Sequence, residues 1–360
     1  MQTLRLKIDP RQLDTPAARA TLAEAAAILR RGGLVALPTE TVYGLGANAL
    51  DGEAVARIFA AKQRPAWDPI IVHVAGRVLE NAMVAALVRE VPERARKLME
   101  AFWPGPLTLL LPRSAAVPDA VTAGRPLVGV RMPSHPVAFA LIEAAGVPVA
   151  APSANLFSRI SPTTAEHVLE DLDGRIDAVL DAGPTEHGVE STVIDPNQSP
   201  MVVYRPGAIT LEQIHAVAGD AVLFESAKAL DAAPREALPS PGVGLRHYAP
   251  RARLILVDGS PAEMQRHIAR AATDDLGEDL RLGVMLPAGW QAPAHAAVFE
   301  WGRWSAPEEL AQRLYAGLRE LDARRCDVIL CPVPGAEGMG AALRDRLRKA
   351  AVTVGAEDDS

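Results

Sequence analysis

Two pairs of polar residues, each separated by one position, are the first candidates for chemistry in this sequence. Lys62 and Arg64 occur in KQRPAWDP, and Ser153 and Asn155 follow an apolar run in VPVAAPSAN. Arg64 precedes a proline, which favours extended backbone, and residues two apart in an extended chain point to the same side. The two cations are therefore expected to converge, and their repulsion favours an anion between them. A solvated basic helix end and a polar turn after a strand are the plainer alternatives.

Further hydroxyl and guanidinium groups follow other apolar runs. Ser and Asn side chains donate hydrogen bonds without carrying charge, so together with Lys and Arg they are suited to surround a phosphate chain. The additional candidates are Arg131, Ser161, Ser191, Thr192 and Arg205. Each of these signals is weak when taken separately.

The segment Gly32 to Leu50, GGLVALPTETVYGLGANAL, carries more polar groups than a simple connection needs. Its residues Leu34 to Leu37 predict a strand, and the hydroxyl-rich PTETVYGLG follows at the carboxyl end of that strand, where open α/β sheets commonly place ligands. The sequence contains no G-x-x-x-x-G-K-[ST] pattern. GLGANA has the form G-x-G-x-x-A but lies well beyond the strand and lacks the acidic residue of a ribose binder. We interpret its glycines as relief of backbone crowding.

Length and composition indicate a globular protein with more than one domain. The chain has 360 residues, of which 49% are hydrophobic and 22% charged, which is too long for one typical core and too apolar for disorder. We expect a cytoplasmic protein without a membrane segment, because no apolar run is long enough to span a bilayer. The net charge of -7 argues against a main role in binding the backbone of nucleic acids. Cys326 and Cys331 fit no zinc or redox spacing and are interpreted as buried thiols.

Alternating helix and strand patterns predict an α/β (α+β) fold of two domains. The first helix has Asp14 or Thr15 as a candidate cap and Pro16 at a first helical position. We expect a first domain over residues 1–219 and a linker over 220–250 with a proline- and glycine-rich core at 238–250. A smaller Rossmann-like α/β domain is expected over 251–355, followed by a tail at 356–360.

Seven segments occur in a fixed order along the first domain. They are LPTETVYGLGANA, KQRPAWDPIIVHV, FWPGPLTLLL, VGVRMPSHP, APSANLFSRISPT, GVESTVID and YRPGAIT. This series resembles the YrdC-like threonylcarbamoyl-AMP synthases along nearly all of Leu22 to Thr210. SPGVGLRHYAP followed by a Rossmann-like unit is similar to the longer, two-domain form of the family. The resemblance implies an N-terminal YrdC-like twisted mixed sheet with helices.

The resemblance implies a nucleotidyltransferase that converts L-threonine, bicarbonate and ATP to L-threonylcarbamoyladenylate and pyrophosphate. The product would supply the N6-threonylcarbamoyladenosine modification of tRNA beside the anticodon, with handover to a tRNA threonylcarbamoyl transferase complex and no stable nucleic-acid complex of this chain. Attack of a threonine carbamate on the α-phosphate develops negative charge that cations stabilise. Mg2+ is expected as the cofactor, held through the ATP phosphates and not by protein side chains.

Residue by residue, the resemblance assigns roles to the polar positions. The residues expected to act on the phosphates and the carbamate are Lys62, Arg64, Ser153 and Asn155. The residues expected to contact ATP are Arg64, Asp68, Ser153, Ser161, Arg205, His247 and Tyr248. The residues expected to contact threonine are Thr41, His73, Arg131, Ser191 and the backbone near Ala151. The loop PTETVYGLG would then line the threonine end of the pocket.

Some of these positions allow other interpretations. Asp68 stands where the family often has Asn, and a carboxylate beside ATP is repulsive unless it faces Mg2+ or the ribose. His73, within IIVHV, also fits a hydrogen-bonded core histidine. Arg246, His247 and Tyr248 are the candidate contacts of the linker, which we interpret as a lid that shields the reactive intermediates from water.

Two alternative functions remain at this point. YrdC-like domains have a concave basic surface that suits RNA, although the net acidity and the absence of RNA-binding signatures argue against this as the main role. Carbamoyl transfer of the hydrogenase-maturation type uses the same Lys-x-Arg and Ser-x-Asn pairs. Those proteins carry extra acylphosphatase and zinc-binding regions, and this chain has neither their length nor their cysteines. The ligand of the second domain and the oligomeric state are not readable from the sequence.

Overall fold

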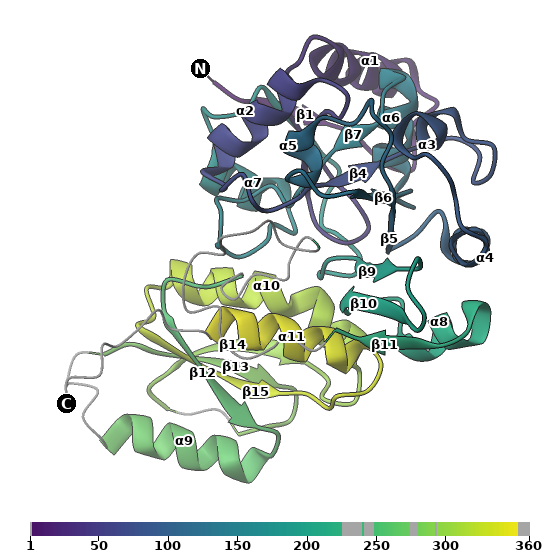
Figure 1. Cartoon of the computed structure of the whole chain (residues 1–360). Helices are drawn as coiled ribbons and strands as arrows, with labels where there is room; N and C mark the ends of the chain where they lie inside the picture. Colours follow the sequence, from purple (N-terminus) through teal and green to yellow (C-terminus); the bar gives the residue numbers. More distant parts are fainter. Residues whose placement is uncertain (1, 225–239, 241–247, 274–279, 292–293, 352–360) are drawn as a thin grey trace, which may run out of the picture. The chain divides into compact units, whose positions relative to one another are not determined.

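A computed structural model describes residues 2–224, 240, 248–273, 280–291 and 294–351 of the chain (Figure 1). The chain divides into two compact units. The first comprises Met1–Phe157 and Ser161–Gly244, and the second comprises Ser158–Ile160 and Leu245–Ser360. The second unit resumes at Leu245, within the predicted linker 220–250, whereas its short piece Ser158–Ile160 was not anticipated from the sequence. The other predicted domain boundaries stay predictions.

The first unit alternates strands and helices along most of its length. Its elements are β1 Leu4–Lys7, α1 Pro16–Arg30, β2 Val35–Leu37, β3 Gly44–Asn48, α2 Gly52–Lys62, β4 Ile71–His73, α3 Ala82–Leu87, α4 Glu93–Phe102, β5 Leu107–Pro112, α5 Asp119–Thr122, β6 Leu127–Arg131, α6 Pro136–Ala145, β7 Val149–Ala150, α7 Ala165–Leu172, β8 Ala178–Asp181, β9 Thr192–Asp195, β10 Met201–Arg205, α8 Leu211–Ala218 and β11 Ala221–Leu223. This content confirms the predicted α/β (α+β) class.

The strands of the first unit form a mixed eleven-stranded sheet in the order β1-β8-β2-β3-β7-β4-β6-β5-β9-β10-β11. The pairs β4 with β6 and β5 with β9 are parallel, whereas β7 runs antiparallel to both β3 and β4. Strands distant in the sequence are therefore neighbours in the sheet. The loops that follow β4 and β6 therefore lie at the same edge of the sheet, and the segment that follows β7 begins beside the start of β4.

Local signals in the sequence explain where the main helices begin and end. Thr15 is the cap of α1, because its side chain accepts a hydrogen bond from the Ala18 amide at 3.3 Å, and Pro16 follows it at the start of the helix. Asp51 caps α2 in the same way through the amides of Glu53 and Ala54. Helix α2 ends at Lys62 because Gln63 adopts the left-handed conformation, with φ 54° and ψ 37°.

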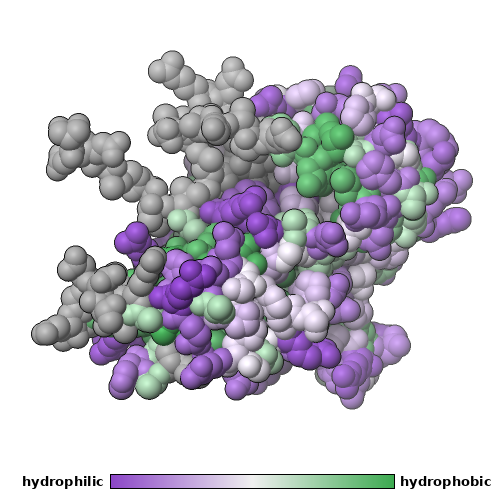
Figure 2. Space-filling view, turned by 90° about the horizontal axis from the view of Figure 1, so that it is seen from below, coloured by the Kyte–Doolittle hydropathy of each residue, from purple (hydrophilic) through white to green (hydrophobic). Residues whose placement is uncertain are grey.

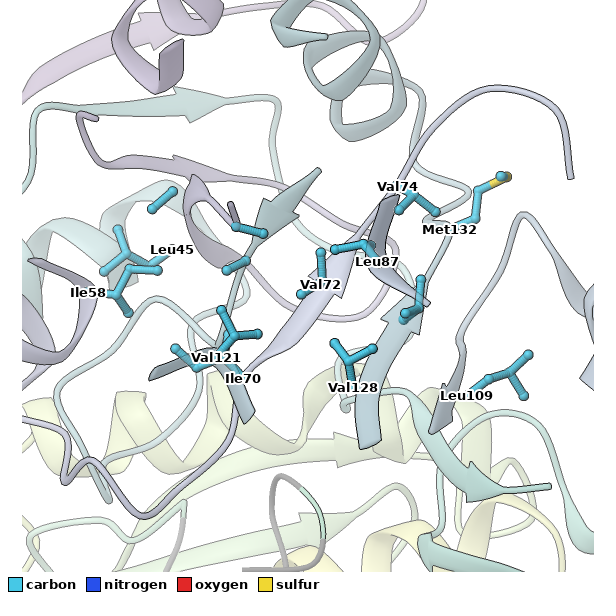
Figure 3. Packing of buried hydrophobic residues seen from close by; sticks show 14 of the residues in the cluster. Leu45, Ile58, Ile70, Val72, Val74, Leu87, Leu109, Val121, Val128 and Met132 are labelled. Carbon is cyan, nitrogen blue, oxygen red and sulfur yellow. The ribbon is translucent and has the colours of Figure 1, made fainter. Parts of the chain in front are cut away.

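The sheet of the first unit is covered by hydrophobic residues on both faces. Along β2 the side chains alternate between two clusters: Ala36 belongs to one that includes residues of α2, and Val35 and Leu37 belong to one that includes residues of α1 and α6. Figure 3 shows the first cluster, in which Ile58 of α2 lies beside Leu45 of β3. A sheet buried on both faces leaves only its strand ends and loops for polar chemistry.

The second unit contains a parallel sheet with helices, as predicted for a Rossmann-like domain. Its elements are β12 Arg253–Asp258, α9 Pro261–Thr273, β13 Leu282–Pro287, β14 Ala297–Gly302, α10 Pro307–Ala323, β15 Val328–Val333 and α11 Met339–Ala351. The strand order is β12-β15-β13-β14, and every pair in it is parallel. Cys326 and Cys331 are buried free thiols, as expected, and burial raises the pKa of Cys331 well above its ordinary value.

On the face seen in Figure 2, hydrophilic residues predominate, and some of the apolar residues gather in a patch among them. In the described part of the chain, the exposed large hydrophobic residues are Leu4, Val222, Leu223, Phe224 and Leu280. Within the described residues, no helix combines the length and apolar character needed to cross a membrane.

Part of the long polar loop predicted after the first strand is itself a strand. Residues Gly44 to Asn48 form β3, which lies between β2 and β7. At Gly46 a Cβ atom would lie 2.9 Å from side-chain atoms of Leu37 and Val149, which belong to the two flanking strands. The glycine-rich pattern therefore reflects close packing, as interpreted, but in a strand and not in a loop.

We predict that Gly46→Ala lowers the free energy of unfolding of the first unit by about 1–3 kcal/mol, because the added methyl group overpacks the centre of the sheet. Thermal and urea unfolding of the full chain would measure the change. Gly52→Ala is the matched control, since its Cβ would lie 3.8 Å from the nearest atom, the Cβ of Pro118. Equal stability of the Gly46 variant and the wild type would contradict the packing described.

Candidate functional site

The ammonium group of Lys62 connects the two motif pairs. It lies at the end of α2, is 1% exposed, and donates hydrogen bonds to the main-chain oxygens of Ser153 and Asn155, each at 2.5 Å. The main-chain oxygen of Lys62 in turn accepts from the Phe157 amide at 2.8 Å. The two pairs predicted to act together thus meet in the structure, through the lysine side chain and backbone carbonyls.

The geometric reason that the sequence offered for pairing Lys62 with Arg64 is wrong. Lys62 is helical and Gln63 is left-handed, so these residues do not form a continuous extended segment. Burial first, and then the positive charge of Arg64, lower the pKa of Lys62 well below its ordinary value, while Asp68 and Asp171 oppose the shift. A buried ammonium near a second cation is suited to receive a multiply charged anion.

Asp68 supplies a carboxylate inside this cationic cluster. Its side chain is 0% exposed and one oxygen lies 3.0 Å from Nη2 of Arg64, at ion-pair distance but outside hydrogen-bond geometry. Arg64 also donates to the main-chain oxygens of Asp68 at 3.3 Å and Pro69 at 2.7 Å. Burial raises the pKa of Asp68, and the charges of Arg64, Lys62 and Arg205 act against that shift. The anion expected between the two cations is present here as a side chain of the protein.

A second buried cluster is centred on the guanidinium group of Arg131, which is 3% exposed at the end of β6. Its Nη1 donates to Thr41 Oγ1 at 2.9 Å, and its Nε donates to the main-chain oxygen of Gly105 at 3.2 Å. Its Nη2 lies 2.6 Å from Oε1 of Glu40. The predicted threonine contacts Thr41 and Arg131 are therefore neighbours.

Glu40 is a site residue that the sequence reasoning missed. Burial raises its pKa, but the positive charge of Arg131 and the nearby donor groups of Arg131 and the main chain outweigh burial, so the pKa lies below its ordinary value. The available signal was a carboxylate between two threonines in PTET, directly after an apolar strand. Such a carboxylate must be paired when it is buried, and its partner is 91 positions later in the chain.

His73 lies beside Arg131, because β4 and β6 pair in parallel with these two residues as direct partners. Burial and then the positive charge of Arg131 lower the pKa of His73 to about 3, so the imidazole is neutral at physiological pH. Its side chain is buried, and Nδ1 has no hydrogen-bond partner in the described structure. A neutral ring with an unused nitrogen suits a hydrogen bond to an uncharged ligand group.

The remaining predicted residues of the first unit extend these clusters. Ser191 Oγ is 2.8 Å from Thr108 Oγ1 and accepts from Arg205 Nη2 at 3.0 Å. Ser161 Oγ donates to Glu190 Oε1 at 2.6 Å. These contacts bring Ser191, which is predicted to contact the substrate threonine, next to Arg205, which is predicted to contact ATP.

The segment that follows β7 joins the opening loop to the site. The Ala151 amide donates to the main-chain oxygen of Ile71 at 2.9 Å, and Ile71 lies two residues before His73 on β4. The Leu45 amide donates to the Pro152 oxygen at 2.7 Å, and Gly44 forms an isolated bridge with Ser153. PTETVYGLG is thus fixed against the Ser-x-Asn segment, which places Thr41 and Ser153 in one polar region.

The linker residues predicted as contacts are only partly described. Arg246 and His247 lie outside the described residues. Tyr248 belongs to the second unit, where it is 5% exposed and stacks on Tyr315 with ring centroids 5.6 Å apart. The guanidinium carbon of Arg346 lies 5.5 Å from the centroid of the Tyr248 ring. The predicted contact of Tyr248 with ATP and the lid stay predictions.

Family comparisons match both parts of the chain. A model of the Sua5, YciO and YrdC proteins, described as "Telomere recombination", matches residues 27–207. A model described as "Threonylcarbamoyl-AMP synthase, C-terminal domain" matches residues 209–352.

Similar proteins have the same two-part organisation. A threonylcarbamoyl-AMP synthase of Pyrococcus abyssi is 44% identical over 91% of this chain and 92% of its own length. One of Bacillus subtilis is 44% identical over 92% of both chains. The crystal structure of P. abyssi Sua5 complexed with L-threonine has a TM-score of 0.85 and 41% identity, and the match covers 98% of both chains. By the two family matches and by these relatives along its length, this chain belongs to the threonylcarbamoyl-AMP synthase family, in its two-domain form.

Proposed function

We propose that this chain forms L-threonylcarbamoyladenylate and pyrophosphate from L-threonine, bicarbonate and ATP. The observation that carries the proposal is the adjacency, within one unit, of a buried cationic cluster around Lys62 and a buried polar cluster around Arg131. The first suits a polyphosphate, and the second suits a small zwitterion with a hydroxyl group. Family membership identifies the reaction that needs both ligands.

The Arg131 cluster binds threonine in this proposal. The remaining donors of Arg131 pair with the carboxylate, while Thr41 and neutral His73 bind the hydroxyl group. Ser191 and the backbone near Ala151 complete the contacts. Because Glu40 already balances the charge of Arg131, the guanidinium group is held in one orientation before the substrate arrives.

The two chemical steps use the second cluster. The amine of threonine attacks the carbon of bicarbonate, and loss of water gives the carbamate. A carbamate oxygen then attacks the α-phosphorus, and the bond to pyrophosphate breaks. Lys62 and Arg64 stabilise the negative charge that develops on the phosphate oxygens, with Ser153 and Asn155 as neutral donors.

The remaining proposed contacts position the nucleotide. Ser161 and Arg205 bind ATP from the side of Ser191, and Asp68 acts through Arg64. His247 and Tyr248 of the linker are proposed as further contacts.

Mg2+ enters with ATP in this proposal. Among the described residues, no group of three or more His, Cys, Asp or Glu side chains is placed to hold a metal ion. In this proposal the phosphates hold the ion, where it would neutralise the charge of the departing pyrophosphate.

The product must be consumed by an enzyme that transfers the threonylcarbamoyl group to tRNA adenosine beside the anticodon. A mixed anhydride of carbamate and phosphate hydrolyses readily, so direct handover to a tRNA threonylcarbamoyl transferase complex protects it. This chain then needs no stable complex with nucleic acid of its own. We place this work in the cytoplasm.

Incubation of the full chain with ATP, radiolabelled bicarbonate and one amino acid at a time tests the reaction. We predict a labelled adenylate with threonine, and a kcat/KM for serine that is about 10–200-fold lower, because serine lacks one methyl group. No labelled adenylate with any amino acid would refute the proposed function. Equal kcat/KM values for serine and threonine would contradict the proposed pocket.

We predict that Lys62→Ala and Arg64→Ala each lower kcat by about 100-fold or more, because each removes a charge that stabilises the transition state. Pyrophosphate release measures the effect. Lys97→Ala, which removes an exposed cation from α4, is the control and should leave kcat unchanged. Retention of normal turnover by both site variants would refute the assignment of the cationic cluster.

We predict that Glu40→Gln raises the KM for threonine by about tenfold and leaves the KM for ATP unchanged, because Arg131 loses the partner that orients it. Initial-rate kinetics with each substrate varied would measure this. Asp195→Asn is the matched control: Asp195 is a buried carboxylate whose partners are Asn197 and Gln198. An equal rise in both KM values would indicate a general structural defect instead.

A further inference from the structure

The side chain of Asp68 occupies the position of an anion within the proposed ATP site. It is fully buried, and one of its oxygens lies 3.0 Å from Nη2 of Arg64. The Asp68 amide donates to the Pro65 oxygen at 3.3 Å, and Arg64 donates to the Pro69 oxygen at 2.7 Å. Arg64 is thus folded back onto the turn that carries Asp68, and its charge is directed at this carboxylate.

The charged groups that act on Asp68 are all cations. They are Arg64, Lys62 and Arg205, from three different segments of the first unit. Asp171 acts on Lys62. Two carboxylates, Asp68 and Asp171, among three cations still leave a positive excess, which favours a polyanion and disfavours a metal ion at Asp68.

The arrival of ATP changes this balance. Phosphate oxygens compete with Asp68 for Arg64, and they place several negative charges beside a carboxylate that water cannot reach. A buried ionised carboxylate that loses its partner is strongly destabilised, and protonation removes the conflict.

We propose that Asp68 is a positioning residue that holds Arg64 in place in the absence of ATP and takes up one proton from solvent when the phosphates replace it as the partner of Arg64. The proposal rests on the proposed function, because it requires that ATP binds at Lys62 and Arg64. The proton bonds to an Asp68 oxygen, and no other bond is formed or broken. ATP binding by this chain is thereby coupled to pH.

The sign of the coupling follows from the two states. In this proposal Asp68 is ionised beside Arg64 in the free protein and protonated beside the phosphates in the complex. Binding therefore takes up a proton at pH values between the pKa of Asp68 in the free protein and its pKa in the complex. The affinity of the wild type for ATP therefore falls as pH rises through this interval. Asp68→Asn removes the titrating group while preserving its shape, so this contribution disappears.

Calorimetric titration of the full chain with α,β-methylene-ATP, without threonine, tests the proposal. Measurements at pH 8 in Hepes and in Tris, whose ionisation enthalpies differ, give the number of protons taken up. On nucleotide binding, we expect the wild type to take up as much as about one proton more than Asp68→Asn. We also expect Asp68→Asn to bind about tenfold more tightly at pH 8, with the difference closing as pH falls to 6.

Three controls make the result specific. Asp195→Asn, which removes a buried carboxylate outside this cluster, should behave as the wild type. Asp68→Ser repeats the test if the Asn variant melts at a lower temperature. Titrations with and without Mg2+ should give the same difference between the wild type and the variant.

Several outcomes would overturn the inference. Equal proton uptake by both proteins would show that Asp68 does not titrate on binding. Weaker binding by Asp68→Asn at every pH, or loss of the effect of Mg2+ in this variant, would show that Asp68 binds the nucleotide or its metal. Absence of binding by both proteins would refute the proposed ATP site itself.

Discussion

A buried lysine ammonium must be solvated by protein atoms, and this requirement organises the candidate site. Lys62 meets it with two main-chain oxygens of the segment that carries Ser153 and Asn155. The burial of one side chain thus fixes the end of α2 against the loop that follows β7. Without those carbonyl contacts, the burial of a positive charge would cost several kcal/mol, and the two motifs would have no reason to stay together.

The same requirement explains why anions lie inside the site. Asp68 faces Arg64, and Glu40 faces Arg131, and all four side chains are largely shielded from solvent. These internal pairs keep two guanidinium groups oriented but leave the cationic cluster with an excess of positive charge. The protein therefore holds its cations in place before any ligand binds, and a ligand only exchanges one set of partners for another.

The mixed sheet brings the interacting residues together. Parallel pairing of β4 with β6 makes His73 and Arg131 neighbours, and antiparallel pairing of β7 with β4 places Val149 opposite His73. The chain then continues to Ser153, which pairs with Gly44. Helices and apolar residues cover both faces, so polar side chains are confined to strand ends. Close packing at Gly46 allows β3 to lie between β2 and β7, which carries the opening loop into the site.

The sequence alone predicted that the first helix begins at Pro16 after a cap at Asp14 or Thr15, and it predicted the Rossmann-like second unit, the buried cysteines and, through seven ordered segments, the family. These signals are local, because capping, side-chain periodicity and motif spacing depend on neighbours in the chain. Only the tertiary structure decided that PTETVYGLG continues into β3, that Lys62 binds carbonyl groups, and that Glu40 and Asp68 neutralise arginines. Glu40 and Arg131 lie far apart in the sequence, and their pairing follows from the order of strands in the sheet. Burial then imposes the pairing, since a charge excluded from water needs an opposite charge or polar groups within a few ångströms.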